Sequence, residues 1–360
     1  MISLITFLLV LGILIIVHEF GHFIAAKRIK VKVEKFSLGF GPALLKKKKG
    51  DTEYSLSLIP LGGYVKLAGD NLEEHKGSPE EYLSRSPFQR AQIIFFGPLL
   101  NYLLGILFFW LIFFAGYPTL TAKVGTLIDG FGAKDAGVEA GDKIVSVDNK
   151  KVDTWDDLQK IIQGKQLNSV AKLNVLRDGK EYALDVKIKE RQGNDLLGQK
   201  RKVGVIGITP ADEIINVRHG FIESFALSID RTVQLTGMTY KALWRMVTGK
   251  LSMRESVTGP LGIFYITSKA AHHGIIAVMN LIALLSISLS IFNLLPLPIL
   301  DGGHILLLGI EKIRGKALGL KAEHVITQVG MALIITLAVF VTYNDVLNFF
   351  GDKIFKLFGR

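Results

Sequence analysis

Two histidines and a glutamate near the N-terminus have the types and the spacing needed to bind a metal ion and use it. His18 and His22 are four residues apart, so on an α-helix both imidazoles lie on one face and can bind one Zn²⁺. Glu19 follows His18 and can act as a general base on a water molecule activated by the metal. This H-E-x-x-H pattern predicts metal-assisted hydrolysis, and the alternative is a pair of solvated histidines at a helix end.

The segment that carries the motif is apolar enough to lie in a membrane. It runs from Ile2 to about Ala26, which is long enough to cross ~30 Å of hydrocarbon. Ionisable groups at that depth are energetically costly and are usually functional, which favours the metal site. The segment has no basic leader and no clear small-residue cleavage site, so we interpret it as a retained membrane helix and not as a signal peptide.

Composition limits the ligands and the partners. The chain has 360 residues, of which 49% are hydrophobic, and a mean hydropathy of +0.37, which is high for an ordinary soluble protein. It has no cysteine, which excludes disulfides and thiolate ligands, so a metal must be held by histidine and carboxylate. The formal net charge is +11. Because the basic residues cluster beside apolar segments, they predict cytoplasmic loops and anionic lipid, and not nucleic acid.

Four apolar segments predict four membrane spans, at about Ile2–Ala26, Ala91–Ala115, Ile275–Leu295 and Val325–Phe350. The loop after the first span is rich in Lys and Arg, whereas nothing basic precedes that span, so the N-terminus is predicted outside and the loop in the cytoplasm. His18 and His22 then lie toward the cytoplasmic side. With four spans, the C-terminus is predicted to lie outside. The basic residues of the C-terminal tail argue mildly against this placement: Lys353, Lys356 and Arg360.

The end of the third span supplies a candidate third ligand. Pro296 and Pro298 forbid a regular helix there, and irregular backbone at membrane depth is tolerated where it lines a cavity. This bend puts Asp301 at the depth of the two histidines and predicts it as the third ligand, with His304 as the rival. Asn293 can hydrogen-bond a substrate carbonyl or a developing oxyanion, and the alternative is a hydrogen bond between helices. Ile305–Lys321 is predicted as a cytoplasmic loop.

Two further features of the first half bear on the site. Tyr54–Leu58 alternates apolar and polar residues and Tyr64–Leu67 follows Gly62-Gly63, which predicts a β-hairpin that is either structural or an edge that pairs with an extended substrate. In the second span, Pro98 and Asn101 are energetically costly in hydrocarbon unless neighbouring helices or a cavity satisfy them. They therefore predict close helix packing or the lining of an active cavity.

The middle of the chain has a different character. Residues 121–210 carry regular charges, short strand patterns and glycines at turns, and Trp155–Ile162 predicts a short amphipathic helix. Ala122–Glu190 resembles a PDZ domain of the bacterial protease type, with Val124–Leu127 at the position of the peptide-binding loop. The resemblance implies peptide capture by strand addition, and the alternative is a steric plug. His219–Val247 predicts an amphipathic helix at the outer membrane boundary, followed by a break at residues 258–263.

In combination these motifs resemble the site-2 protease family. The match is to its bacterial branch of regulator-of-sigma-E proteases and covers nearly the whole chain, although some members of that branch have two PDZ domains and this chain has one. The resemblance implies zinc-dependent intramembrane cleavage of single-pass membrane proteins, such as anti-sigma factors or remnant signal peptides, in the bacterial inner membrane. It also implies that the hairpin pairs with substrate, at Tyr64 and Val65, and that Asn293 contacts substrate.

We therefore expect a mainly α polytopic membrane protein with four transmembrane helices, a cytoplasmic membrane-associated β-hairpin and one α/β PDZ domain outside the membrane. The expected divisions are 1–116 (spans 1 and 2 with the zinc motif and hairpin), 117–210 (PDZ domain), 211–274 (periplasmic amphipathic segment) and 275–360 (spans 3 and 4). The expected partners are a single-pass substrate, membrane lipid and a peptide or partner at the PDZ domain.

Two other functions compete with an intramembrane protease. One is a catalytically inactive scaffold whose PDZ domain recruits partners, and the intact motif residues oppose it. The other is a membrane-anchored zinc peptidase acting on soluble peptides, and it is opposed by the position of the histidine pair within an apolar span.

Overall fold

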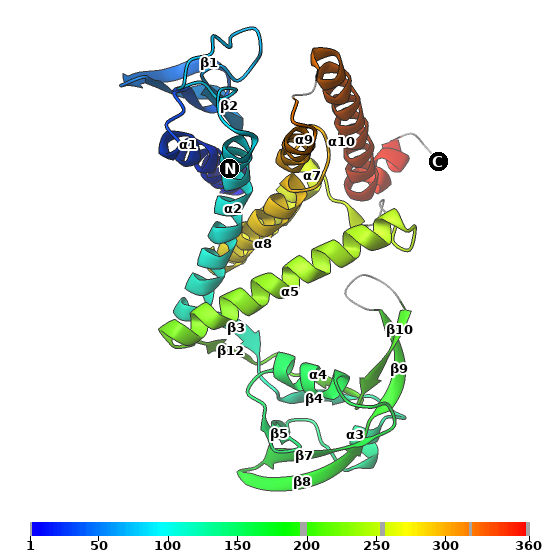
Figure 1. The fold of residues 1–360 in the computed structure, drawn as a ribbon. Helices are drawn as coiled ribbons and strands as arrows, with labels where there is room; N and C mark the ends of the chain where they lie inside the picture. Colours follow the sequence, from blue (N-terminus) through cyan, green and yellow to red (C-terminus); the bar gives the residue numbers. More distant parts are fainter. Residues whose placement is uncertain (1, 195–199, 253–255, 317–318, 358–360) are drawn as a thin grey trace. The chain divides into compact units, whose positions relative to one another are not determined.

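The computed structural model describes residues 2–194, 200–252, 256–316 and 319–357. The chain forms two compact units, one of Met1–Ile112 with Ile222–Arg360 and the other of Phe113–Phe221. Figure 1 shows the helices of the first unit and the mixed strands and helices of the second. The side chains of Lys353 and Lys356, and all of Arg360, lie outside the described residues.

Within the described ranges, four helices are long and apolar enough to cross a membrane, in agreement with the four predicted spans. They are α1 (Ile2–Arg28), α2 (Pro87–Ala115), α8 (Ile275–Asn293) and the Val325–Leu347 part of α10 (Leu320–Leu357). Their apolar residues are distributed around the whole helix rather than along one face, which is typical of segments surrounded by lipid and other helices. The chain is thus a multi-pass membrane protein.

Glycines allow these helices to approach one another closely. A Cβ atom at Gly21 of α1 would lie 2.2 Å from the Phe96 carbonyl oxygen of α2. A Cβ at Gly105 of α2 would lie 2.5 Å from Ile287 of α8. Small residues at such crossings allow backbones to come into contact, which is how membrane helices gain packing energy without a hydrophobic driving force. Helices α1, α2 and α8 therefore form a tight group.

The bend predicted after the third span is present. Residues Leu294–Leu300 leave the helix, and α9 (Asp301–Arg314) begins at Asp301. Cβ atoms at Gly302 and Gly303 would lie 2.2 and 2.0 Å from the carbonyl oxygens of Leu294 and Leu297, so only glycine lets α9 fold back on the bend. The prediction of a loop at Ile305–Lys321 is wrong for Ile305–Arg314, which belongs to α9. Leu308 is buried there and gives this segment an apolar helical face.

The break at residues 258–263 is the start of another helix. Helix α7 (Pro260–His272) begins with proline in its first turn, where the missing amide has no cost. Asp345 of α10, fully buried, accepts hydrogen bonds from the amides of Gly259 (3.1 Å) and Gly262 (2.9 Å). The carboxylate thus satisfies the free amides of this helix end and ties α10 to α7.

The amphipathic helix predicted within His219–Val247 is confirmed as α5 (Phe221–Val247). Ser224, Ser228 and Thr232, at four-residue spacing, form its buried face. One turn further, the half-buried Thr236 hydrogen-bonds the Tyr102 hydroxyl of α2 (3.0 Å). Large apolar side chains are exposed on the rest of the helix: Ile222, Ile229, Val233, Tyr240, Trp244 and Val247.

The predicted hairpin has a different pairing in the structure. Strands β1 (Val33–Lys49) and β2 (Thr52–Leu67) reverse direction near Gly50 and pair antiparallel. Ser37, however, pairs with Tyr64 on one side and with Ser55 on the other, so the first part of β1 separates the two halves of β2. The predicted pairing about Gly62-Gly63 is wrong, because alternation within β2 says nothing about the strand that enters between its halves. Gly63–Leu67 thereby becomes an edge of the sheet.

The second unit combines antiparallel sheets with two short helices. Its strands are β3 (Tyr117–Leu120), β4 (Val124–Leu127), β5 (Lys143–Val147), β6 (Lys150–Lys151), β7 (Val170–Arg177), β8 (Lys180–Lys187), β9 (Lys189–Asn194), β10 (Lys200–Val205), β11 (Ile208–Pro210) and β12 (Ile214–Val217). The largest sheet has the order β6-β5-β7-β8. Strand β12 pairs with β3, so the unit continues past residue 210.

Helix α4 (Trp155–Gln163) confirms the predicted short amphipathic helix, and α3 (Gly132–Asp135) is the other helix of the unit. The Thr154 hydroxyl accepts the Asp157 amide (3.2 Å), and the Asp157 carboxylate accepts the Thr154 amide (3.0 Å). This reciprocal cap fixes the start of α4. Trp155, Leu158 and Ile162 then join the core formed with the sheet strands.

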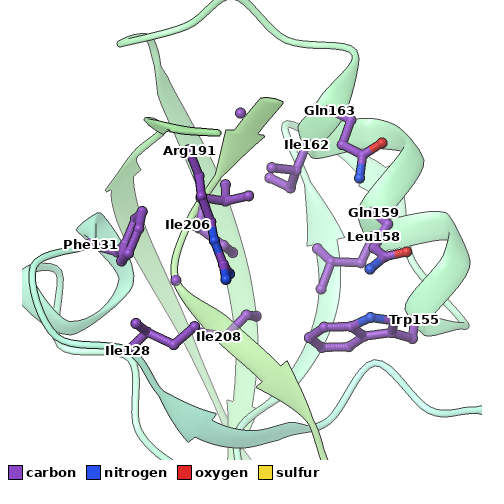
Figure 2. A pocket seen from close by; sticks show the side chains of 13 residues that line it. Ile128, Phe131, Trp155, Leu158, Gln159, Ile162, Gln163, Arg191, Ile206 and Ile208 are labelled. Atoms are coloured by element: carbon purple, nitrogen blue, oxygen red, sulfur yellow. The ribbon is translucent and has the colours of Figure 1, made fainter. Parts of the chain in front are cut away.

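A hollow of about 160 Å³ lies between α4 and the chain from β10 to β11. Figure 2 shows Trp155, Leu158 and Ile162 directed from α4 toward Ile206, with the Arg191 side chain nearby. The chain segment that lines the hollow is Gly204–Ile208. Val124–Leu127, expected to be the peptide-binding loop, instead forms β4 and pairs with β11.

A buried carboxylate organises the second unit. Asp142 is 1% exposed and accepts hydrogen bonds from Arg177 Nε (2.7 Å), Arg177 Nη2 (2.8 Å) and the Glu139 amide (2.9 Å). Burial by itself raises the pKa of the Asp142 carboxyl, but these hydrogen bonds outweigh burial and hold the pKa below its ordinary value.

This arrangement predicts a pH-dependent stability. Because the folded-state pKa of Asp142 is lowered, its contribution is present above the unfolded pKa of about 3.9 and is lost as pH falls through the folded value. Asp142→Asn should lower the stability of this unit at pH 7 by about 1.5–3 kcal/mol, the range for hydrogen bonds to charged groups. Hydrogen exchange of the β5 and β7 amides measures it. A difference between wild type and variant that stays constant from pH 7 to pH 3 would contradict this account.

Candidate active site

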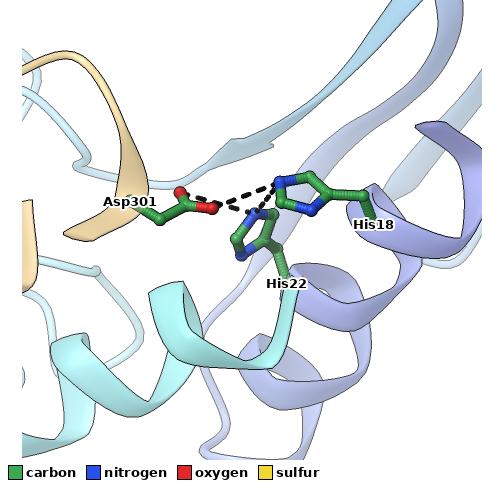
Figure 3. A group of neighbouring side chains, drawn as sticks. All are labelled: His18, His22 and Asp301. Carbon is green, nitrogen blue, oxygen red and sulfur yellow. Dashed lines mark hydrogen bonds and ion pairs between the residues drawn. The ribbon is translucent and has the colours of Figure 1, made fainter. Parts of the chain in front are cut away.

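Three side chains from opposite ends of the chain meet at one point. Helix α1 presents His18 and His22 on the same face, with their Nε2 atoms 3.2 Å apart. The first residue of α9 brings Asp301, whose Oδ2 lies 3.2 Å from His18 Nε2 and whose Oδ1 lies 3.8 Å from His22 Nε2. Figure 3 shows the three groups directed toward one another. The two predicted histidine ligands and the predicted carboxylate ligand are thus brought together.

The donor set of this group fits a zinc ion. Its three ligand atoms lie within 4.8 Å of one another, and all three residues are half-buried. Asp301 Oδ2 is buried and accepts no hydrogen bond among the described residues, as expected of an atom that serves a cation. Two imidazoles and a carboxylate are a common catalytic zinc set, which leaves one position for water or substrate. His304, the rival ligand, is exposed on α9 and lies outside the group.

One face of α2 supports the two histidines. The His22 Nδ1 donates to the Ile93 carbonyl oxygen (2.9 Å), which leaves the Nε2 lone pair directed at the site. One turn further along, a Cβ atom at Gly97 would lie 2.4 Å from His22 Nε2 and 3.0 Å from His18 Cε1. Glycine at this position therefore lets α2 come into direct contact with both imidazole rings.

Two asparagine amides approach His18 from different helices. Asn293 of α8 places its Nδ2 3.5 Å from His18 Nε2, so the predicted substrate-binding residue lies at the edge of the metal group. Asn101 of α2 is fully buried, and its Nδ2 lies 3.4 Å from His18 Nδ1. The sequence indicated only packing or cavity lining for Asn101. Its spacing of four residues from Gly97 was the available signal that it shares a face with the site.

The predicted base, Glu19, faces the edge of the β1–β2 sheet. The Val65 amide lies beside its carboxylate. A Cβ atom at Gly63 would lie 3.2 Å from Glu19 Cγ, so the sheet edge comes into contact with α1 at this point. Tyr64 points elsewhere: its ring stacks on Phe40 with centroids 6.3 Å apart and lies 5.5 Å from Lys35 Nζ. Of the two predicted hairpin residues, Val65 therefore contacts the catalytic motif directly.

An ion pair ties the helix that carries Asp301 to α2. Arg90, 8% exposed near the start of α2, pairs with Glu311 of α9. The Arg90 guanidinium also lies 6.0 Å from the centre of the Tyr82 ring. Since α2 already contacts both histidines, this pair connects the third ligand to the same helix.

Several known proteins are similar to this chain over nearly its whole length. A putative zinc metalloprotease from Agrobacterium fabrum is 33% identical over 366 residues, covering 97% of this chain and 96% of that protein. Proteins with the same description from Campylobacter jejuni (32% over 352 residues, 96% and 93%) and Clostridium acetobutylicum (34% over 340 residues, 94% and 96%) are similar.

Among solved structures, the PDZ domain of an SdrC-like protein from Listeria monocytogenes matches with 24% identity and a TM-score of 0.21. It covers 27% of this chain and 90% of that one.

The family comparison covers almost the whole chain. The model of peptidase family M50 matches residues 6–337, which include all three members of the metal group and Glu19. The chain belongs to peptidase family M50, the site-2 protease family of membrane metalloproteases.

Proposed function

We propose that the protein is a zinc-dependent intramembrane endopeptidase that cleaves single-pass transmembrane segments. The observation that carries this proposal is the convergence of Asp301, at the start of α9, with His18 and His22, which lie on a helix apolar enough to span a membrane. A peptidase for soluble peptides has no need to place its polar groups at such a cost in hydrocarbon. Substrates of the proposed class include anti-sigma factors and remnant signal peptides, which would make the reaction a step of regulated intramembrane proteolysis.

His18 Nε2, His22 Nε2 and an Asp301 carboxylate oxygen would hold the zinc ion. The bound ion would supply Lewis-acid chemistry, polarising a peptide carbonyl and lowering the pKa of water. The protein's part is to keep these three groups in place. The Ile93 carbonyl orients His22, and the packing of Gly302 and Gly303 on the bend orients Asp301.

Glu19 is the proposed general base and acid. It would take a proton from the attacking water and pass it to the leaving amine of the peptide bond. The Val65 amide, which lies beside this carboxylate, would help to orient it. Asn293 would donate a hydrogen bond from Nδ2 to the substrate carbonyl oxygen, which gains negative charge as the bond is attacked.

The Gly63–Leu67 edge is the proposed docking site for the substrate backbone. A transmembrane helix bonds its amides and carbonyls internally, so it must unwind locally before a peptide bond can be attacked. Unwound backbone in hydrocarbon needs replacement hydrogen bonds. Among the described residues, Gly63–Leu67 pairs with β1 on one side only, and it contacts Glu19 on α1. An added strand is a known way to bind an extended peptide.

The rest of the chain would control access and orientation. The hollow between α4 and Gly204–Ile208 would bind a peptide or partner, or the PDZ-like unit would exclude large substrates. The proposed topology has the N-terminus and this unit outside the cytoplasm and the active site toward the cytoplasmic side of the bacterial inner membrane. Helix α5, with its exposed apolar side chains, would lie at the outer membrane boundary, in contact with lipid.

The base assignment predicts that Glu19→Gln abolishes cleavage but keeps the metal. Loss of a general base lowers rates by about 10²–10⁴-fold. The measurement is cleavage of a model transmembrane substrate in proteoliposomes, with zinc content determined on the same preparation. Retained cleavage would remove Glu19 from the mechanism. A wild type that binds zinc but cleaves no transmembrane substrate would favour the inactive scaffold.

The ligand assignment predicts that Asp301→Ala lowers zinc affinity by at least about 100-fold, the upper end of the loss caused by removing a partner that only orients a ligand. His304→Ala is the matched control, because this histidine lies on the same helix and is exposed. Elemental analysis of the purified proteins measures both. Normal zinc content in Asp301→Ala, or loss of zinc in His304→Ala, would reverse the assignment.

The docking proposal predicts disulfide cross-links between substrate and the Gly63–Leu67 edge. The chain has no cysteine, so single cysteines can be placed at Tyr64 and Val65 in a Glu19→Gln background that retains uncleaved substrate. A substrate with one cysteine near its cleavage position should cross-link several-fold more to these positions than to Leu45→Cys. Leu45 lies in the other edge segment of the sheet. Equal yields at all three positions would reduce the sheet to a structural role.

A further inference from the structure

We propose that Asn101 is a positioning residue for the metal site: its side-chain oxygen accepts the Nδ1 proton of His18 and so keeps His18 Nε2 free to bind zinc. This inference rests on the proposed zinc site and adds a residue to it. Asn101 lies on α2, has 0% exposure, and is within hydrogen-bond distance of His18 Nδ1, at 3.4 Å.

The Asn101 amide can hydrogen-bond a neutral imidazole in two ways. A neutral histidine carries one proton, on Nδ1 or on Nε2. If the Asn101 NH₂ group donates to Nδ1, the proton of His18 must sit on Nε2, the atom that faces Asp301 and His22. That tautomer cannot bind a metal through Nε2. If the amide is turned by 180°, its oxygen accepts the Nδ1 proton and the Nε2 lone pair is free.

A second observation favours the turned amide in the metal-loaded protein. Asn101 Oδ1 is buried and has no hydrogen-bond partner among the described residues. An unpartnered amide oxygen is costly in an apolar interior, and more so in a membrane helix. Turning the amide gives this oxygen the Nδ1 proton as its partner, and the NH₂ group takes the position that the oxygen leaves. The orphaned acceptor and the requirement of the metal therefore point to the same orientation.

The other histidine already has such a partner. His22 Nδ1 donates to the Ile93 carbonyl oxygen at 2.9 Å. Ile93, Gly97 and Asn101 follow one another at four-residue spacing on the face of α2 that contacts the histidines. On this face the Ile93 carbonyl and the Asn101 side-chain oxygen are the two acceptors, and Gly97 between them leaves room for the imidazole rings. The Asn101 backbone is held in turn by Ser286 of α8, whose Oγ donates to its carbonyl oxygen at 2.7 Å. This bond holds the Asn101 backbone against α8.

The alternative is that Asn101 only packs α2 against its neighbours. The two roles predict different effects of an Asn101 substitution on zinc affinity. Residues that hydrogen-bond a metal-binding histidine fix its tautomer, and their removal lowers the affinity for the metal by about 10–100-fold. Removal of a residue that only packs changes the stability of the fold and leaves the metal affinity unchanged.

The experiment measures zinc affinity and thermal stability of the purified full-length protein in detergent, by competition with a chelator of known affinity and by unfolding of the zinc-free form. Asn101→Leu, similar in shape but without an acceptor, should weaken zinc binding by 10–100-fold. Asn101→Asp, which keeps an acceptor, should bind zinc within a few-fold of wild type. Tyr102→Phe is the matched control, because it removes a hydrogen bond from the next residue of α2 without touching His18.

Unchanged zinc affinity in Asn101→Leu would overturn the proposal, whatever its melting temperature. If Asn101→Leu does not fold, ¹⁵N NMR of histidine-labelled, zinc-loaded wild type decides: a protonated His18 Nδ1 is expected, and a deprotonated one overturns the inference. His18→Ala separates this result from failure of the zinc site. Full zinc affinity in His18→Ala would reject the proposed site itself, whereas loss of zinc in His18→Ala with normal Asn101→Leu would reject only the role of Asn101.

Discussion

The structure depends on one constraint: polar groups placed in hydrocarbon must find their partners within the protein. His18 and His22 lie on a helix whose other residues suit lipid, so each imidazole must be oriented by atoms from neighbouring helices. His22 uses a backbone carbonyl of α2, and Asp301 reaches both rings from the start of α9. The site is therefore a property of the packed helix group and not of α1 alone.

Glycine makes this packing possible. At Gly21, Gly97 and Gly105 a single Cβ atom would come within 2.2–2.5 Å of a neighbouring helix, and at Gly97 the obstructed atoms belong to the imidazole ring of His22. In a soluble protein such glycines would weaken their helices, but membrane helices gain from backbone contact more than they lose. Gly302 and Gly303 have the same role at the start of α9, where they let Asp301 approach from the bend.

The sequence predicted what depends on local pattern and missed what depends on distant partners. The four spans, helix α5 and the convergence of His18 and His22 follow from apolar length and helical spacing, and Asp301 follows from the depth of the bend. The pairing of Tyr54–Leu58 with Tyr64–Leu67 failed because Ser37 and its neighbours enter between them, a long-range event that alternation cannot reveal. The sequence showed that Asn101 is energetically costly in hydrocarbon. Its neighbour His18 belongs to another helix, so only the structure identifies it as the partner.

The same constraint applies to the proposed substrate. A segment unwound for cleavage exposes amides and carbonyls that have no water to bind, so the protein must offer backbone groups at the point where the bond is broken. A helix has none to spare, because its own bonds use them, whereas the edge of a sheet has a free row. Gly63 lets such an edge reach α1, where a Cβ would lie 3.2 Å from Glu19 Cγ, and the Val65 amide lies beside the Glu19 carboxylate. The sheet beside α1 therefore belongs to the proposed intramembrane chemistry as much as the proposed metal ligands do.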